Sequence, residues 1–298
     1  MPTSATGDDG MMVRFWGVRG SLPTPGPSTV RYGGNTPCVE LRCGPHLLIL
    51  DAGSGIRGFG ASLGRGVEAD ILLSHTHYDH ICGLPFFRPL FDPAATLRIW
   101  GGHLTHPDGI RSALSVTWRK PLMPDLDAEF RARVSFQDFA AGATLALAHG
   151  PRVDTIALRH PGGSVGYRIS WEGRSVCYIT DTEHSADGPD ADLVAFVRGT
   201  DILIHDATYT EEEYRTRHGW GHATWSAAAE LATVGRVGSL VLFHHDPDHD
   251  DDWMDAIGAA AARSCPDAVV AREGMRIALA SLTEYQGATA SFGSKPHI

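Results

Sequence analysis

The sequence has few cysteines, and no two of them form a CxxC pair. Its 5 cysteines in 298 residues are odd in number and scattered, which argues against a disulfide framework or a thiolate zinc ribbon. It has no run of 18 or more apolar residues, so we expect no transmembrane helix. Residues 1–10 are polar and acidic and lack the apolar segment of a signal peptide. We therefore expect a cytoplasmic protein with reduced thiols.

Positive charge is scarce as well. The chain has 25 Lys and Arg against 35 Asp and Glu, which gives a formal net charge of -10 and a pI of about 5.8. This balance argues against a large basic surface for long nucleic acid, although a local basic pocket remains compatible with it. We expect no membrane partner and a small-molecule substrate.

No repeat and no low-complexity linker divides the chain. After a tail at residues 1–10 that we expect to be disordered, short apolar strands alternate with helical segments. This pattern predicts a single α/β domain over 11–298, with two mixed sheets between helical layers. We expect a helix over 83–90. The irregular stretch 103–135 either covers a site as a lid or rim or is ordinary surface.

The most informative motif is His-Thr-His-Tyr-Asp-His at residues 75–80, which follows the apolar run 69–74. A buried strand that ends in such a cluster places its side chains just past its carboxyl end, where α/β folds hold their chemistry. Imidazole and carboxylate suit zinc, manganese or iron. His75 and His77 can converge on one metal. Asp79 and His80 can face a second metal about 3.5–4 Å away, as in two-metal hydrolases.

Three more ligand-type residues directly follow apolar strands. His160 comes after the strand 155–159, Asp181 after 175–180 and His244 after 240–243. One such residue alone is more often a cap or turn residue, but three of them added to the histidine cluster predict a dinuclear site. His245 is adjacent to His244 and is the alternative ligand at that strand end.

The ordered set of these residues resembles the metallo-β-lactamase fold superfamily of hydrolases, and the resemblance covers the chain from about residue 14 to 270. It implies an αββα sandwich and two divalent ions, with zinc the first choice and manganese the second. The metal ligands that it implies are His75, His77 and His160 for one ion, Asp79, His80 and His244 for the other, and Asp181 as the bridge. Members of the superfamily are often dimers, so we expect a homodimer.

Four further segments resemble the phosphodiesterase branch of the superfamily, which includes tRNA 3′-processing endonucleases and a cyclic phosphodiesterase of phosphonate breakdown. They are residues 19–21, 162–168, 204–209 and 221–224. The last segment, Gly-His-Ala-Thr, is similar to a Gly-His-Ser-Thr motif whose His meets the scissile phosphate, with Ala223 in place of the Ser. The resemblance implies that His222 is a general acid or a phosphate-stabilising group. The alternative is an ordinary residue near a helix N-terminus.

The resemblance also indicates a substrate class. The tRNA-processing members carry a long arm that grips tRNA, expected between the third His and the bridging Asp, and here only a hairpin joins His160 to Asp181. This favours a small cyclic or linear phosphodiester, hydrolysed by a metal-bound hydroxide that Asp79 helps to orient. Arg168 and Arg19 are candidate substrate-binding residues, with a structural role as the alternative.

Other functions stay open. A lactonase or another carbonyl-directed metallohydrolase would use the same metals on a carbonyl group. An RNA 3′-end processing nuclease is the second enzyme alternative. A binding or regulatory module that has lost catalysis is the non-enzyme alternative, but such modules normally lose ligands, and here every one is present.

Overall fold

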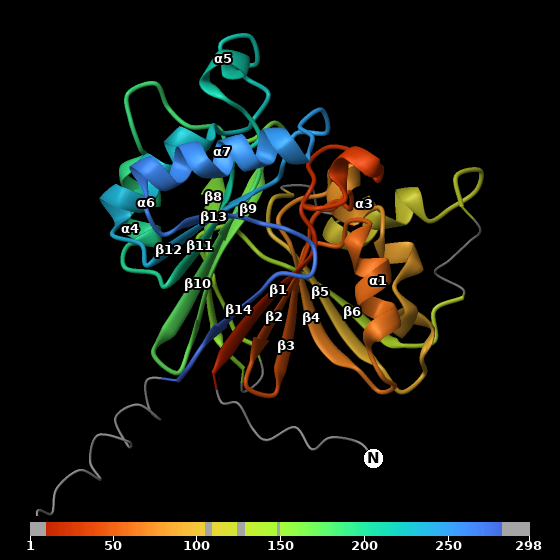
Figure 1. Cartoon of the computed structure of the whole chain (residues 1–298). Helices are drawn as coiled ribbons and strands as arrows, with labels where there is room; N and C mark the ends of the chain where they lie inside the picture. The colour runs from red at the N-terminus through yellow and green to blue at the C-terminus, as the bar shows by residue number, and fades with distance from the viewer. Residues whose placement is uncertain (1–9, 105–108, 124–128, 148–149, 282–298) are drawn as a thin grey trace, which may run out of the picture.

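The computed structural model describes residues 10–104, 109–123, 129–147 and 150–281 (Figure 1). The predicted disordered tail at 1–10 lies outside them except for its last residue. In strand order, the first sheet is β14 (Arg276–Leu279), β1 (Met11–Gly17), β2 (Cys38–Cys43), β3 (His46–Leu50), β4 (Glu68–Leu73), β5 (Thr96–Gly101) and β6 (Arg133–Asp138). The second is β13 (Ala268–Val270), β12 (Ser239–Phe243), β11 (Ile202–Asp206), β10 (Arg174–Ile179), β9 (Ser164–Trp171), β8 (Arg152–Leu158) and β7 (Thr144–Leu145).

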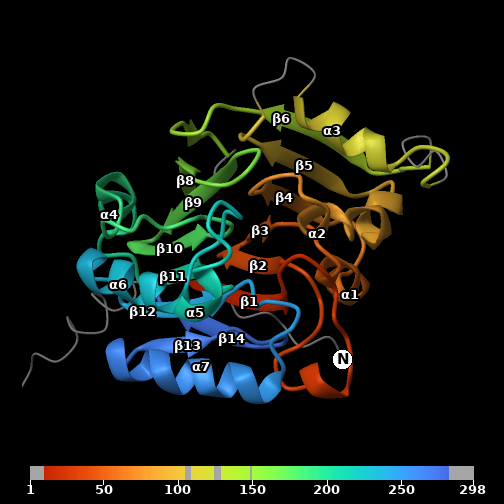
Figure 2. The same ribbon diagram turned by 90° about the horizontal axis from the view of Figure 1, so that it is seen from above.

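Both sheets are mixed, as predicted. Strands β3 to β6 run parallel, whereas β14, β1, β2 and β3 pair antiparallel. In the second sheet β10 to β13 are parallel and β7 to β10 antiparallel. Parallel neighbours end at the same edge, so β4, β10, β11 and β12 deliver their following loops to one end of the sandwich, which Figure 2 shows from above.

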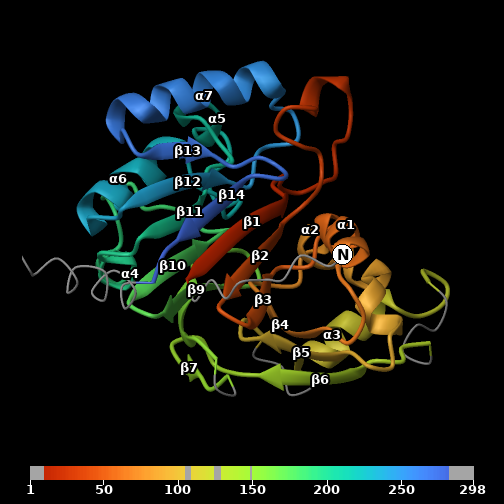
Figure 3. The ribbon, with the colours of Figure 1, turned by 60° about the horizontal axis from the view of Figure 1, so that its bottom comes forward.

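The longer helices cover the outer faces of both sheets: α1 (Gly55–Ser62), α3 (Gly109–Thr117), α4 (Ala191–Val197), α6 (Trp225–Gly235) and α7 (Asp251–Ser264). The four-residue helices α2 (Tyr78–Ile81) and α5 (Glu211–Tyr214) lie in loops that follow strands β4 and β11, and α5 stands above the end of the sandwich in Figure 1. Helices α6 and α7 lie along the second sheet and α1 along the first, on opposite sides of the sandwich (Figure 3). The predicted αββα sandwich is therefore confirmed. None of the helices in the described ranges is long and apolar enough to cross a membrane.

Alternation along the strands sorts apolar side chains into three buried clusters. Phe15, Leu50 and Phe243 belong to the cluster between the sheets. Leu203 and Leu242 belong to the cluster under α4, α6 and α7, and a third cluster lies under α1 and α3. The central strands β4, β10, β11 and β12 are buried on both faces, so they read in the sequence as nearly continuous apolar runs.

Two predictions about local structure need correction or completion. The predicted helix at 83–90 is instead two 3-10 turns, η2 (Leu84–Phe86) and η3 (Arg88–Phe91). Each turn holds a proline near its start, where the missing N–H and the fixed backbone angle interrupt a longer helix. Within 103–135, residues 105–108 and 124–128 lie outside the described part of the chain. In the described part, α3 packs Ile110 and Leu114 into the outer layer, and the strand β6 begins.

Candidate metal centre

The candidate site lies at the shared end of the two sheets. The motif 75–80 follows β4, Asp181 follows β10 and His244 follows β12, while His160 lies between β8 and β9. Asp181 and His244 adopt positive φ angles of 54° and 62°. Backbone strain of this kind at non-glycine residues clusters at functional sites, because the surrounding structure must hold it in place.

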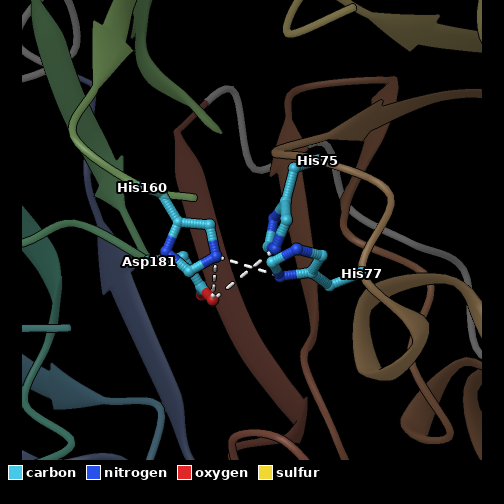
Figure 4. Close-up of side chains that lie close together, drawn as sticks. All are labelled: His75, His77, His160 and Asp181. Atoms are coloured by element: carbon cyan, nitrogen blue, oxygen red, sulfur yellow. Dashed lines mark hydrogen bonds and ion pairs between the residues drawn. The ribbon is translucent and has the colours of Figure 1, made fainter. Parts of the chain in front are cut away.

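A first group of ligand-type atoms is formed by His75, His77, His160 and Asp181, which lie within 4.8 Å of one another. Figure 4 shows the three imidazoles and the carboxylate pointing toward a common centre. His160 Nε2 lies 3.0 Å from His77 Nδ1, and both His75 Nε2 and His160 Nε2 lie 3.6 Å from Asp181 Oδ2. His77 is exposed, so this group is open to solvent on one side.

A second group is formed by Asp79, His80 and His244. Nε2 of His80 and Nε2 of His244 each lie 3.2 Å from Asp181 Oδ1, and they lie 3.2 and 3.3 Å from Asp79 Oδ2. Asp181 thus turns one carboxylate oxygen toward each group. This is the arrangement expected of a carboxylate shared by two cations.

The residues of both groups fit divalent metal ions. His75 Nε2 is buried and has no hydrogen-bond partner, so its lone pair is free for a ligand bond. Burial, with repulsion from His80, lowers the pKa of His75 well below its usual value and keeps it neutral. Burial alone would raise the pKa of Asp181, but the imidazoles of His244, His80 and His75 lower it, so it is ionised. Neutral imidazole and ionised carboxylate are the donor forms that zinc and manganese require.

Hydrogen bonds on the far ring nitrogens orient three of the imidazoles. His80 Nδ1 lies 2.8 Å from Asp51 Oδ2, His244 Nδ1 lies 3.0 Å from Thr208 Oγ1, and His160 Nδ1 donates to the carbonyl oxygen of Gly221 at 2.8 Å. Gly221 has a φ of +85°, and a Cβ there would lie 2.3 Å from the His160 ring. Such partners fix the tautomer of a ligating His and raise its basicity.

Asp51 is the best connected of these partners. It is fully buried, accepts hydrogen bonds from Ser74 N at 2.7 Å and from the Tyr178 hydroxyl at 2.8 Å, and has a φ of 60°. The sequence offered one signal for Asp51, which is that it directly follows a buried strand, as Asp181 and His244 do.

Replacing Asp51 with Asn is expected to weaken zinc binding by about 10- to 100-fold, because the neutral amide no longer supports the His80 imidazole. Competition with a chromogenic chelator measures this affinity. Asp70→Asn is a matched control, since Asp70 is a buried carboxylate on β4 that pairs with Arg98 away from the cluster. Zinc affinity equal to that of the unmodified protein in Asp51→Asn would contradict the assigned role.

His222 lies beside the two groups and is paired with Asp206. His222 Nδ1 is 2.8 Å from Asp206 Oδ2 and 3.9 Å from Asp181 Oδ2. Burial alone would lower the pKa of His222, but the carboxylates of Asp206 and Asp181 outweigh it and raise the pKa to about 9. The raised pKa favours the protonated form of the ring. His222 also completes a third cluster of ligand-type atoms, with Asp181, Asp206 and His244.

At the end of β12 the structure brings His244, and not His245, into the cluster. The buried His245 ring donates from Nε2 to the carbonyl oxygen of Ala271 at 2.8 Å. Gly20 packs against His244 so closely that a Cβ would lie 2.3 Å from its ring. The loop from Gly17 to Ser21 therefore closes over His244, and Ser21 N donates to Asp79 Oδ2 at 2.8 Å.

The two predicted substrate-binding arginines do not reach the cluster with their guanidinium groups, which is a correction to the sequence analysis. Arg168 donates to the carbonyl oxygens of Phe196 and Arg198, beside α4 on the outer face of the second sheet. Arg19 is fully buried and donates to the carbonyl oxygens of Gly33, Asp246 and His249. Both guanidinium groups are used to hold loops together.

Replacing Arg19 with Ala is expected to lower the free energy of unfolding by about 3 kcal/mol or more, because three buried carbonyl groups lose a charged donor. Urea unfolding followed by circular dichroism measures the loss. Arg31 provides the control, since its side chain is 51% exposed and its ion pairs are on the surface, where about 1 kcal/mol or less is expected. A loss in Arg19→Ala no larger than in Arg31→Ala would argue against the structural role.

His103 is a residue near the site that the sequence analysis missed. Its Nε2 lies 3.0 Å from Thr76 Oγ1, and its ring centroid is 6.3 Å from that of His75. Burial lowers the pKa of His103 to about 4, so the ring is neutral. His103 follows β5 after one further glycine, so the strand-end rule would have included it if applied to every strand of the first sheet.

Curated relatives share most of the chain. The Ribonuclease Z of Gemmatimonas aurantiaca is 25% identical over 92% of this chain and 97% of its own. The Ribonuclease Z of Bradyrhizobium sp. is 28% identical over 80% of this chain and 90% of its own.

Solved structures share the fold. The short form of human tRNase Z has a TM-score of 0.66 at 21% identity, covering 89% of this chain and 98% of that one. A diphosphatase from the PhnP family has a TM-score of 0.67 at 19% identity, covering 90% and 97%. Zn(2+)-bound PqqB from Methylobacterium extorquens has a TM-score of 0.67 at 17% identity, covering 90% and 100%.

The family described as "Beta-lactamase superfamily domain" matches residues 46–245. This range contains all seven residues for which the resemblance implied a metal-binding role, and it confirms that resemblance. The chain therefore belongs to the β-lactamase superfamily and is a metal-dependent hydrolase of the metallo-β-lactamase fold.

Proposed function

We propose that this protein is a dinuclear phosphodiesterase that hydrolyses a small cyclic or linear phosphodiester. The observation that carries the proposal is the His222–Asp206 pair, with Nδ1 and Oδ2 2.8 Å apart, set beside two ligand groups that share Asp181. A phosphodiester leaves an alkoxide that requires a proton, and a carbonyl-directed hydrolase such as a lactonase would use the same groups. The segments 204–209 and 221–224, which contain Asp206 and His222 and resemble the phosphodiesterase branch, favour the phosphodiester.

His75, His77 and His160 would hold one ion, and Asp79, His80 and His244 the other, with Asp181 between them. Two divalent ions bound there would supply a nucleophile at neutral pH, by lowering the pKa of water, and would neutralise charge on the phosphoryl oxygens. Zinc is the first choice and manganese the second, because imidazole and carboxylate suit both. Asp79 orients the nucleophile through the carboxylate that also faces His80 and His244.

His222 delivers the proton. Its Nδ1 donates to Asp206, which leaves Nε2 to donate to the leaving oxygen. Asp206 is itself held by Thr208, whose backbone N–H and hydroxyl both donate to its Oδ1. The ring is therefore oriented before the substrate arrives, and little reorganisation is needed at the moment of transfer.

RNA 3′-end processing is the second candidate, and the relatives named Ribonuclease Z favour it. The expectation that long nucleic acid is not a partner finds no support in those relatives. Two features of this chain favour the small substrate. The strands β9 and β10, between His160 and Asp181, are joined by the short turn Glu172–Gly173 where the resemblance places an arm for tRNA. The formal net charge is -10.

Turnover of bis(p-nitrophenyl) phosphate by the zinc- or manganese-loaded protein tests the proposal. We expect diester cleavage well above that of p-nitrophenyl phosphate or of a simple lactone in parallel assays. A precursor tRNA with a 3′ trailer distinguishes the two candidates. Rapid lactone opening without diester cleavage would overturn the phosphodiesterase proposal, and cleavage of the trailer at low protein concentration would favour the RNA nuclease.

A further inference from the structure

A cavity of about 440 Å³ lies on the outer face of the second sheet. Its walls include residues of β8, the start of α4 and one side of α6, and these two helices lie side by side in Figure 2. Ile156, Leu193 and Leu231 give it an apolar lining, and none of the residues assigned to the metals or to proton transfer lines it. A volume of this size suits a small organic molecule.

Two histidines add nitrogen atoms to this apolar lining. His205 of β11 is 3% exposed, and burial lowers its pKa and keeps the ring neutral. Its Nδ1 donates to the carbonyl oxygen of Asp206 at 2.7 Å, which leaves Nε2 as a hydrogen-bond acceptor. The buried Nδ1 of His184 has no hydrogen-bond partner among the residues that the structure describes. Buried polar atoms without partners cost free energy, so a ligand with a hydrogen-bond donor suits this cavity better than a purely apolar one.

The rim of the cavity is acidic. Four carboxylates line it, from Glu183, Asp190, Asp192 and Glu230, against one cationic side chain among the described residues, Arg159. The side chains of Asp192 and Glu230 are exposed at its mouth. A mouth with an excess of carboxylates attracts cations and repels anions.

Hydrogen bonds hold the walls of the cavity in place. Glu183 N donates to the carbonyl oxygen of Arg159 at 2.8 Å, and the Glu183 carboxylate accepts from Gly221 N at 3.0 Å. Asp190 caps α4 by accepting from two backbone N–H groups of its first turn. A site with fixed walls requires little ordering when a ligand enters, which favours binding.

We propose that this cavity is a second ligand site, separate from the metal centre, and that it binds a small organic amine in its cationic form. The apolar lining accommodates the carbon body, Nε2 of His205 accepts a hydrogen bond from the ammonium group, and the acidic rim favours its positive charge. The inference does not depend on the proposed function, because diester cleavage uses none of these groups.

Calorimetry with benzylamine, benzyl alcohol and benzoate tests this, because these probes are alike in size and differ in the charge of the polar group. In zinc-loaded protein at neutral pH, cationic benzylamine should bind at least about tenfold more tightly than benzyl alcohol, and benzoate should bind most weakly. His205→Phe keeps a ring and removes the acceptor, so the affinity for benzylamine should fall by about tenfold or more. Asp192→Asn combined with Glu230→Gln should lower it by about threefold and leave benzyl alcohol unaffected.

A cavity-filling substitution tests the location. Ala227→Phe should abolish benzylamine binding, because Ala227 lines the cavity, whereas Val234→Phe at an exposed position of the same helix should leave it unchanged. Amines can also coordinate zinc, so binding that persists in Ala227→Phe and is lost on removal of zinc would place benzylamine at the metal centre and overturn the inference. Equal affinities for the three probes, or no binding of benzylamine, would overturn it as well. If His205→Phe fails to fold, the rim variant, whose two substitutions are at exposed positions, still decides the result.

Discussion

Replacing Asp181 with Asn is expected to remove metal binding at both groups. Diester cleavage should fall by more than about 100-fold, which is the upper end of the loss seen when only a hydrogen-bond partner of a metal ligand is removed. The carboxylate lies between the two groups, with Oδ1 3.2 Å from the imidazoles of His80 and His244 and Oδ2 3.6 Å from those of His75 and His160. An amide offers one neutral oxygen and turns N–H groups toward the other ligands. Metal content after dialysis against zinc, measured by mass spectrometry, should fall from about two ions per chain to less than one.

Asp201→Asn is the control for Asp181→Asn. Asp201 accepts from Ser175 N at 2.8 Å and from Arg174, at the opposite end of β10 from Asp181. We expect this variant to keep its full metal content. The rise in melting temperature on adding zinc should be present in Asp201→Asn and absent in Asp181→Asn, because only a ligand that binds the folded state raises its stability. Two ions bound by Asp181→Asn would show that the carboxylate is not shared.

The sequence carries much of the fold because its central parallel strands are buried on both faces. Residues 71–73 and 240–243 read as continuous apolar runs, and such runs need no long-range information to be recognised as strands. The same reasoning placed the ligand-type residues, since a polar His or Asp directly after a buried run must lie at the carboxyl edge of a sheet. That His160, Asp181 and His244 lie at one common end follows from strand order, which the resemblance supplied.

What could not be predicted from the sequence depends on contacts between distant segments. Strand β6 was not predicted from the sequence. None of its six residues is buried, so it lacks the apolar run that marks the central strands. The carbonyl oxygen of Gly221, which orients His160, belongs to the backbone and leaves no trace in residue type. The choice between phosphate binding and a structural role for Arg19 stayed open, because a buried arginine that satisfies backbone carbonyls is the same residue type as one that binds substrate.

Replacing His222 with Ala is expected to lower kcat for a dialkyl phosphodiester by about 10²- to 10⁴-fold, because the leaving alkoxide loses its proton donor. The loss should be much smaller for a diester with a p-nitrophenolate leaving group, which departs without a proton. This dependence on the leaving group distinguishes a proton donor from a residue that only supports the fold. The measurement is kcat for the two diesters at neutral pH, with metal content determined on the same samples.

His218→Ala is the matched control for His222→Ala, since His218 is in the same loop with a side chain that is 60% exposed. We expect it to keep both activities. His222 also belongs to a cluster with Asp181, Asp206 and His244, so metal ligation is the competing role. If His222 were a metal ligand, its loss would lower metal content and slow cleavage of both diesters to a similar extent, because the nucleophile and not the leaving group would be affected.

Asp206→Asn sharpens the distinction. Losing the carboxylate that lies 2.8 Å from His222 Nδ1 should reproduce the selective loss on the dialkyl diester while the metals stay bound, because the imidazole is then neutral and poorly oriented.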